Sequence, residues 1–352
     1  MLLSAHAAFP ERRFVADGTR GLDALELMDR GRHVAAAMKR ALPPDFDEAA
    51  RILIASLDSP LDRTSGMGMT AFLYLPHTIF VAENGLDHFE SSMAAQHALT
   101  QRFTAEFSIR AFLDRDPQRT LARLRTWTAD PNVHVRRLVS EGTRPRLPWA
   151  PRLRAFQRDP TPVLELLELL RDDPEIYVRR SVANNLNDIG KDHPDILLAV
   201  CARWARGASP ERMALIQHAL RWLIKKGDRA ALRVLGFEGG EHVAVAGRIH
   251  PRRLSVGETC VIELLLENHG PRTQSAVVDL AVHYVKADGR ARAKVFKVQS
   301  VRLDPGEQAI LAKSISFAQR TTRRHHPGRH RIDALLNGRA VPIGHVDVKA
   351  PR

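Results

Sequence analysis

The sequence predicts a mostly α-helical chain in which a solenoid of stacked helix pairs precedes a β-sandwich domain. Two observations predict this order. A helix–turn–helix unit recurs with an offset of 43 residues in the first two thirds of the chain, and short β-type runs separated by glycine-containing turns fill the last third. We therefore expect two domains, residues 1–238 and residues 239–352.

The internal repeat is clearest in two ten-residue segments, Asp130–Val139 and Asp173–Val182, which share Asp, Pro, Val, Arg, Arg and Val in the same places. An apolar helical segment precedes each one, Leu121–Trp127 and Leu164–Leu170. Two helices in a period of about 40 to 47 residues are typical of HEAT repeats. Such pairs bury their apolar faces by stacking, which leaves a concave surface lined by the second helices. A less regular third unit follows over 196–225.

The segment before the repeats also reads as helical. We expect helices over Leu22–Met38, Asp47–Leu57 and Leu99–Phe112, with a loop over Asp58–Met69, where Pro60, Gly66 and Gly68 interrupt the periodicity. In the third helix Glu106 borders the apolar stripe, which is an unusual place for a carboxylate unless a cation pairs with it.

The last third of the chain has the spacing of β-strands. Its apolar runs are Val243–Ala246, Thr259–Leu266, Ala276–Val285, Ala293–Val298 and Ala309–Phe317. Asp288-Gly289, Pro305-Gly306 and Asn337-Gly338 supply turns. About seven short strands in roughly 110 residues are typical of an immunoglobulin-like sandwich.

The formal net charge of +13 favours a polyanionic partner, nucleic acid first and an anionic membrane surface second. The charge is uneven. Residues 102–158 contain thirteen Arg against five Asp or Glu, and residues 239–352 contain nineteen Lys or Arg against ten Asp or Glu. Arg136-Arg137 and Arg179-Arg180 recur at the repeat offset. These arginines either bridge to an aspartate of the neighbouring repeat or contact phosphates.

No feature of the sequence predicts a metal, a disulfide or a membrane span. Cys201 and Cys260 form no CxxC pair, and His325-His326 with His330 lie in a run without nearby carboxylates, so a metal site there is a minor alternative. No apolar run approaches the roughly 18 to 20 residues of a membrane helix. The first residues lack the basic region of a signal peptide, so we expect the bacterial cytoplasm.

The stretch Val139–Trp149 groups residue types that suit a cationic or phosphate-bearing ligand. Gly142 and Pro145 end a helix, Glu141 lies on its last turn, and two arginines and a tryptophan follow. A carboxylate and an aromatic ring attract cations, and guanidinium groups bind phosphates. In the alternative interpretation, Glu141 is solvated and Trp149 serves packing.

Three segments, Leu99–Arg110, Ser140–Ala150 and Val178–Pro194, resemble the DNA alkylation repair glycosylases built from HEAT-like repeats, in their AlkC branch. The resemblance covers roughly residues 50–235, and residues 239–352 resemble the immunoglobulin-like domain of some AlkC proteins. It implies a hydrolase of base excision repair. Its expected substrates are cationic N-alkylated bases in double-stranded DNA: 3-methyladenine and 3-methylcytosine, with 1-methyladenine as a further one. It would act as a monomer, with no cofactor and no metal.

A cationic base is already a good leaving group, so such an enzyme has to stabilise positive charge on the deoxyribose and orient a water. Carboxylates beside an aromatic ring suit that task. By motif position, the resemblance implies catalytic roles for Glu106, Glu141 and Asp188. It implies substrate-binding roles for Trp149, Arg144, Arg146, Arg152, Arg179 and Arg180.

Two other classes of protein remain open from the sequence alone. One is a HEAT-repeat protein that binds nucleic acid without chemistry, and the other is a protein-interaction adaptor, the commonest role of HEAT arrays. The basic charge disfavours the adaptor. Convergence of Glu106, Glu141, Asp188 and Trp149 on one basic groove would favour the glycosylase.

Overall fold

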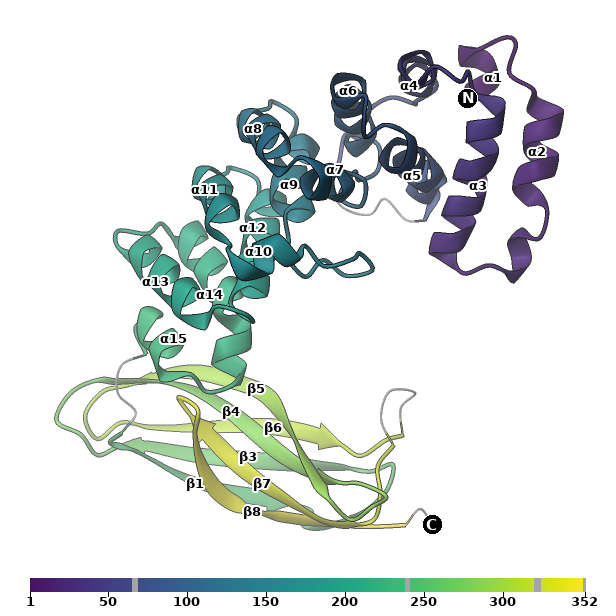
Figure 1. The fold of residues 1–352 in the computed structure, drawn as a ribbon. Helices are drawn as coiled ribbons and strands as arrows, with labels where there is room; N and C mark the ends of the chain where they lie inside the picture. Colours follow the sequence, from purple (N-terminus) through teal and green to yellow (C-terminus); the bar gives the residue numbers. More distant parts are fainter. Residues whose placement is uncertain (65–68, 238–240, 320–323, 351–352) are drawn as a thin grey trace. The chain divides into compact units, whose positions relative to one another are not determined.

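The computed structural model describes residues 1–64, 69–237, 241–319 and 324–350, and it confirms a mostly helical region followed by a β-sandwich (Figure 1). It divides into two compact units, Met1–Leu197 with Ser209–Ala219, and Leu198–Ala208 with Leu220–Arg352. The predicted boundary between residues 238 and 239 lies outside the described residues and stays a prediction.

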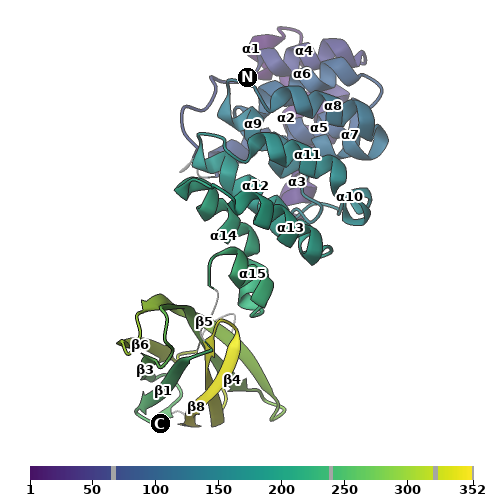
Figure 2. The same cartoon turned by 90° about the vertical axis from the view of Figure 1, so that its left-hand side faces the viewer.

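Up to Leu197, the helical region consists of helices that follow one another side by side (Figures 1 and 2). Their bounds are α1 Leu2–Ala5, α2 Glu11–Thr19, the 3-10 turn η1 Leu22–Ala24, α3 Leu27–Ala41, α4 Phe46–Ala55, the 3-10 turn η2 Thr70–Tyr74, α5 Leu75–Asn84, α6 Phe89–Thr100, α7 Ile109–Arg115, α8 Pro117–Trp127, α9 Val133–Gly142, α10 Arg154–Arg158, α11 Thr161–Leu170, α12 Ile176–Ile189, α13 Pro194–Ala205, α14 Pro210–Lys225 and α15 Arg229–Val234.

The two predicted repeat units are the pairs α8–α9 and α11–α12. In each, the side chain of the turn aspartate accepts a hydrogen bond from the backbone two residues later, Asp130 from the N–H of Asn132 at 2.8 Å and Asp173 from that of Glu175 at 2.9 Å. Aspartate favours this local turn, which explains why Asp-Pro recurs there. α8 packs on α11 and α9 packs on α12, so first helices form one layer and second helices another.

The paired arginines of the two repeats have different environments. Arg136 donates to the carboxylate of Asp173 in the next repeat, with Nε 2.6 Å from Oδ2. It also donates to the carbonyls of Asp130 and Pro131 in its own turn. Arg179 makes the equivalent bonds to the carbonyls of Asp173 and Pro174. The bridge to a neighbouring repeat is therefore the correct interpretation for Arg136.

The predicted helix over Leu99–Phe112 is wrong, because α6 ends at Thr100 and α7 begins at Ile109. Between them the backbone N–H of Glu106 donates to the hydroxyl of Thr104 at 3.3 Å, a local bond that competes with helix formation. Glu106 therefore lies in a connection between helices. The predicted helix Leu22–Met38 is also divided, into η1 and α3. Gly66 and Gly68 of the predicted loop lie outside the described residues.

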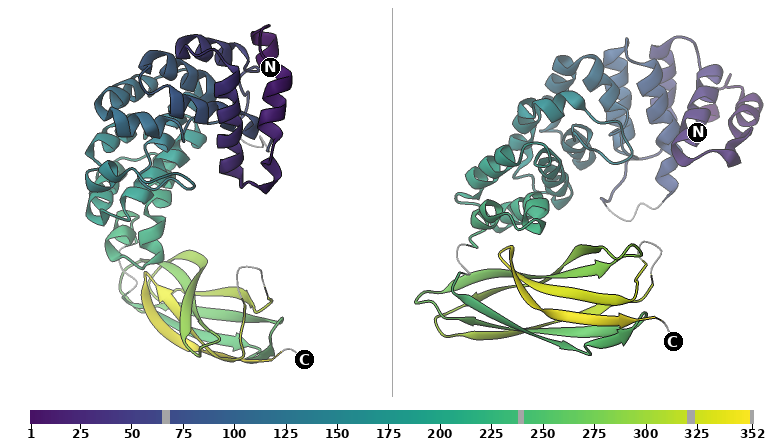
Figure 3. Two further views of the ribbon diagram at one scale, coloured as in Figure 1. Left: turned by 45° about the vertical axis from the view of Figure 1, so that its right-hand side comes forward. Right: turned by 60° about the horizontal axis from the view of Figure 1, so that its bottom comes forward.

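The sandwich has two sheets, which form two layers in Figure 3, with strand orders β1-β3-β6 and β2-β8-β7-β4-β5. The strands are β1 Val243–His250, β2 Arg253–Ser255, β3 Thr259–Asn268, β4 Gln274–Val285, β5 Ala291–Leu303, β6 Gln308–Ser316, β7 Gly328–Leu336 and β8 Arg339–Lys349. All neighbouring pairs are antiparallel except β2 with β8. Alternate residues of β3 and β4 form its core, among them Leu264 and Leu280.

Within the described residues, no helix combines the length and the apolar character needed to cross a membrane.

Candidate active site

The site is built at the ends of α9 and α12, the second helices of adjacent repeats. Glu141 lies on the last turn of α9 and Asp188 on the last turn of α12. Arg144, just after α9, joins them: its Nη1 donates to Oε1 of Glu141 at 2.6 Å and its Nε donates to Oδ2 of Asp188 at 2.8 Å. Stacking of the two repeats therefore brings these acids to one guanidinium.

Glu106 joins the same network through Arg137, which points from α9. Nη1 of Arg137 donates to Oε2 of Glu106 at 2.6 Å, and its Nη2 lies 3.5 Å from Oε1 of Glu141. The hydroxyl of Thr104 also donates to Oε2 of Glu106, at 2.8 Å. The three predicted acids thus converge, although they come from three separate elements.

Further donors complete the network. The hydroxyl of Ser181 donates to Oε2 of Glu141 at 2.6 Å, and Ser140 in turn donates to Ser181 at 2.7 Å. The ammonium of Lys191 lies 2.7 Å from Oδ1 of Asp188. All four oxygens of Glu141 and Asp188 consequently have a donor within hydrogen-bond distance.

Both acids at the helix ends are buried: the side chain of Glu141 is 7% exposed and that of Asp188 is 1% exposed. Burial alone raises the pKa of Glu141, but the charges of Arg137 and Arg144 and the hydrogen bond from Ser181 outweigh it and lower the pKa below its usual range. Burial lowers the pKa of Arg144, and the two carboxylates reverse this and raise it. Glu141 and Arg144 are therefore both ionised at neutral pH.

A buried arginine of α7, Arg110, holds the loop over residues 143–153 in place. Nη1 of Arg110 donates to the carbonyls of Gly142 at 3.1 Å and Arg144 at 2.7 Å, and its Nη2 donates to the carbonyl of Pro151. Burial lowers the pKa of Arg110 to about 10, so it stays charged. Both ends of the loop, which projects beside α10 in Figure 1, are thus fastened to α7.

Trp149 lies at the outer part of this loop and outside the carboxylate network. Its side chain is 73% exposed, and its backbone is left-handed with φ +63°. No aromatic ring or cation of the described residues stacks on it. Arg146, on the same loop, forms a two-pronged ion pair with Asp192, with Nε 2.8 Å from Oδ2. The guanidinium of Arg146 is thus occupied by an ion pair within the protein.

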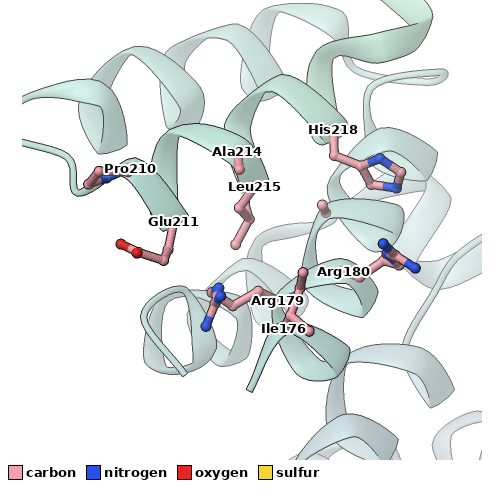
Figure 4. Close-up of a pocket in the computed structure, with 9 residues that line it drawn as sticks. Ile176, Arg179, Arg180, Pro210, Glu211, Ala214, Leu215 and His218 are labelled. Atoms are coloured by element: carbon pink, nitrogen blue, oxygen red, sulfur yellow. The ribbon is translucent and has the colours of Figure 1, made fainter. Parts of the chain in front are cut away.

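The remaining predicted arginines lie away from the acids. Arg152 is exposed. Arg179 and Arg180 line a groove of about 390 Å³ between α12 and α14, where Figure 4 shows them opposite Glu211 and His218. Nη1 of Arg179 is occupied by the turn carbonyls, whereas Arg180 is exposed. These residues could contact phosphates, but they do not belong to the buried network.

The structure thus brings together Glu106, Glu141, Asp188 and Arg144, and it leaves Trp149, Arg146, Arg152, Arg179 and Arg180 outside their network. Sequence reasoning did not identify a role for Arg110, Ser181, Lys191 or Tyr177, and for Arg137 it predicted a bridge to an aspartate or a phosphate contact instead of the observed pairing with Glu106 and Glu141. The guanidinium of Arg137 lies 5.4 Å from the ring centroid of Tyr177, and the ring of His134 contacts Tyr177 edge-on. His134 and Tyr177 occupy the same position in the two repeats, which was a usable signal.

Comparison with known proteins identifies both parts of the chain. A family model described as DNA alkylation repair enzyme matches residues 80–226. The chain is 37% identical over 315 residues to the uncharacterized protein YhaZ of Bacillus subtilis (strain 168), over 89% of this chain and 85% of that one. The chain belongs to the DNA alkylation repair enzyme family. The predicted acids Glu106, Glu141 and Asp188 all lie inside the segment that the family model matches.

A solved member of the DNA alkylation repair enzymes resembles the chain over nearly its full length. The structure of Pseudomonas fluorescens alkylpurine DNA glycosylase AlkC bound to DNA containing an abasic site analog superposes with a TM-score of 0.89 at 37% identity. The match covers 99% of this chain and 95% of that one. The model of the C-terminal Ig-like domain of YhaZ matches residues 244–350, so the predicted sandwich is confirmed as immunoglobulin-like.

Within residues 1–64, 69–237, 241–319 and 324–350, no three or more His, Cys, Asp or Glu side chains form a group that could hold a metal ion. His325, in the run considered as a minor metal alternative, is buried against the rings of Tyr284 and Phe317. The acids of the site are held by cationic side chains of the protein itself.

Proposed function

We propose that this DNA alkylation repair enzyme is a glycosylase that hydrolyses the N-glycosidic bond of cationic N-alkylated bases in double-stranded DNA. The proposed substrates are 3-methyladenine and 3-methylcytosine, with 1-methyladenine as a further one. The observation that carries the proposal is the convergence of Glu106, Glu141 and Asp188 on two arginines, in a chain of this family. The AlkC structure, solved with abasic DNA, supports DNA as the partner.

The chemistry follows from the charges involved. When the bond between C1′ and the base nitrogen breaks, the bonding electrons leave with the cationic base, which departs neutral, and positive charge appears on the deoxyribose. A carboxylate near the sugar stabilises that charge. Water then adds its oxygen to C1′ and gives a proton to a carboxylate, which leaves an abasic site. Glu141 suits the stabilisation of charge on the sugar, because its lowered pKa keeps it ionised.

The exposed residues of the predicted set suit contacts with the DNA itself. Trp149 offers a ring that can stack on a base, and Arg152 and Arg180 offer charges for phosphates. Phosphate contacts position a protein on the duplex and give an affinity that falls with salt. We therefore assign these residues to binding and the buried network to the chemical step.

The test is a base-release assay with the full chain. Duplex DNA that contains one defined lesion, 3-methyladenine, 3-methylcytosine or 1-methyladenine, is incubated with the protein in excess chelator, and released bases are identified by mass spectrometry. We expect release of cationic bases and none from the unmodified duplex. Tight binding without any release would instead identify a non-catalytic DNA-binding protein, and release that requires an added metal would contradict the proposed chemistry.

A further inference from the structure

Lys191 lies just past the end of α12 and covers the catalytic candidate Asp188. Its ammonium is 2.7 Å from Oδ1 of Asp188, while Nε of Arg144 occupies Oδ2 at 2.8 Å. The carboxylate, with a side chain 1% exposed, is thereby covered on both oxygens. A ligand from solution that needs this carboxylate has to displace one of the two cations.

The charges of the network cancel within the protein. Glu106, Glu141 and Asp188 face Arg137, Arg144 and Lys191, one cation for each acid. A site for a cationic substrate would be expected to carry a net negative charge, since like charges repel a cation. The free protein therefore holds its acids in a neutralised form, and substrate binding has to change that balance.

Lys191 is the cation of the three that can leave most easily. The two arginines donate to several partners each, and their side chains are largely buried. The side chain of Lys191 is 34% exposed, and its one hydrogen bond given by the structure is that to Asp188. A lysine ammonium on a flexible stem gains solvation when it swings into water, whereas a forked guanidinium loses its paired geometry.

We propose that the Lys191 ammonium holds the place of the cationic substrate at Asp188 and is exchanged for it, so that Lys191 competes with cationic ligands for this carboxylate. This inference rests on the proposed function. A positively charged lesion or sugar restores the pairing of the buried carboxylate when Lys191 leaves. A neutral nucleotide cannot, and an unpaired buried carboxylate is strongly unfavourable. The buried carboxylate of Asp188 thus favours a cationic ligand before any bond breaks, and competition from Lys191 reduces that preference.

The exchange also lowers the apparent affinity for cationic ligands. When only a fraction of the protein molecules is competent to bind, the apparent affinity is reduced by that fraction. Here the competent molecules are those in which Lys191 has left Asp188. Removal of the lysine side-chain charge should therefore tighten binding of a cationic ligand and leave binding of a neutral one nearly unchanged, apart from the general loss of one positive charge.

The experiment compares two duplexes that differ only in charge at one nucleotide, a cationic pyrrolidine abasic analogue and a neutral tetrahydrofuran analogue. The ratio of their dissociation constants is measured by fluorescence anisotropy. For Lys191→Met we expect the preference for the cationic duplex to rise by about threefold or more, the size of a partly exposed ion pair. Lys191→Arg keeps a cation at Asp188, and because a guanidinium leaves less easily, the ratio should not rise above the wild-type value.

A matched control, Arg180→Met, removes a cation from α12 away from Asp188, so it should weaken both duplexes equally. If Lys191→Met leaves the ratio at the wild-type value, or shifts it no more than Arg180→Met does, the inference is wrong. The ratio is measured without turnover, so it is independent of base release. If the wild-type protein released no base but Lys191→Met still shifted the ratio, the proposed function would be wrong and the role of Lys191 would be supported.

Discussion

Nε of Arg144 lies 2.8 Å from Oδ2 of Asp188, although the two residues are 44 positions apart in the sequence. Arg144 follows α9 and Asp188 ends α12, so this bond exists only when adjacent repeats are stacked. Asn185 strengthens the same junction, because its side-chain amide donates to the carbonyl of Ser140 at 2.8 Å, near the end of α9. The geometry of the site is therefore a product of repeat stacking.

Replacement of either acid at the helix ends should slow the chemical step. For Glu141→Gln and Asp188→Asn we expect base release to fall by about a hundredfold to a thousandfold, the size reported for loss of one preorganised charge-stabilising group. Duplex affinity should change far less, because the negative charge matters mainly after bond cleavage begins. Single-turnover rates and anisotropy measure the two effects separately.

The control for these variants is Glu83→Gln, an exposed acid near the end of α5. It should leave both base release and affinity at the wild-type level. A Glu141→Gln or Asp188→Asn protein that retained nearly full activity would remove that acid from the proposed chemistry.

Loss of Arg110 should loosen the loop over residues 143–153. Arg110→Met leaves three carbonyls without their donor, and we expect a loss of about 3 kcal/mol in the free energy of unfolding, together with faster trypsin cleavage after Arg146 and Arg152. Urea denaturation and limited proteolysis measure these effects. Arg115→Met, an exposed arginine of the same helix, should do neither. Equal behaviour of the two variants would show that Arg110 does not hold the loop.

The stability contributed by Glu141 should depend on pH in one direction. Its pKa is lowered in the folded state from a usual value of 4.5, so the folded protein binds its proton less tightly than the unfolded chain does. The contribution is therefore fully present above pH 4.5 and is lost as the pH falls through the folded-state pKa. The difference in unfolding free energy between wild type and Glu141→Gln should stay constant from about pH 8 to pH 5 and shrink below that.

Urea unfolding at a series of pH values measures this difference, with Glu83→Gln as the control whose difference from wild type stays near zero. A difference that already shrinks between about pH 7 and pH 5 would mean that the pKa of Glu141 is not lowered.

At position 149, glycine should stabilise the folded protein relative to other residues, because the backbone there is left-handed. A non-glycine residue in the left-handed region costs about 1 kcal/mol, and Trp149 has φ +63° there. Trp149→Gly should therefore exceed Trp149→Ala in thermal stability, because alanine keeps the Cβ atom that causes the cost. Both variants should lose duplex affinity through loss of the ring. Wild-type affinity in both variants would show that Trp149 has no part in binding.

The fold was predictable where the sequence repeats itself. Asp130–Val139 and Asp173–Val182 share the residues that build the turn and the core, so α9 and α12 are where the pattern places them. Strands β2, β7 and β8 were not identified. β7 alternates exposed Arg329 and Arg331 with buried His330 and Ile332, and a buried histidine breaks the apolar alternation that marks a strand.

Of the residues in the buried network, the three acids were predicted by the resemblance to a known family, and most of their cationic partners were not. That Arg137 contacts both Glu106 and Glu141 depends on how α9 lies beside the α6–α7 connection, and no local pattern carries that information. The connection itself was misjudged, because Phe103 and Phe107 keep helical spacing although Thr104 diverts the backbone. Tertiary contacts decide such positions, whereas propensity decides long periodic helices.

The bond from Arg136 to Asp173 has a consequence for how the array unfolds. The carboxylate of Asp173 accepts a hydrogen bond within the turn of its own repeat and another from Arg136 of the preceding repeat. Unfolding of one repeat therefore breaks a bond to the other. In stacked arrays such nearest-neighbour coupling sets the size of the cooperative unit. Hydrogen exchange in α9 and α12 should therefore report a single free energy of opening. The ends of these helices, which carry Glu141 and Asp188, should then unfold together.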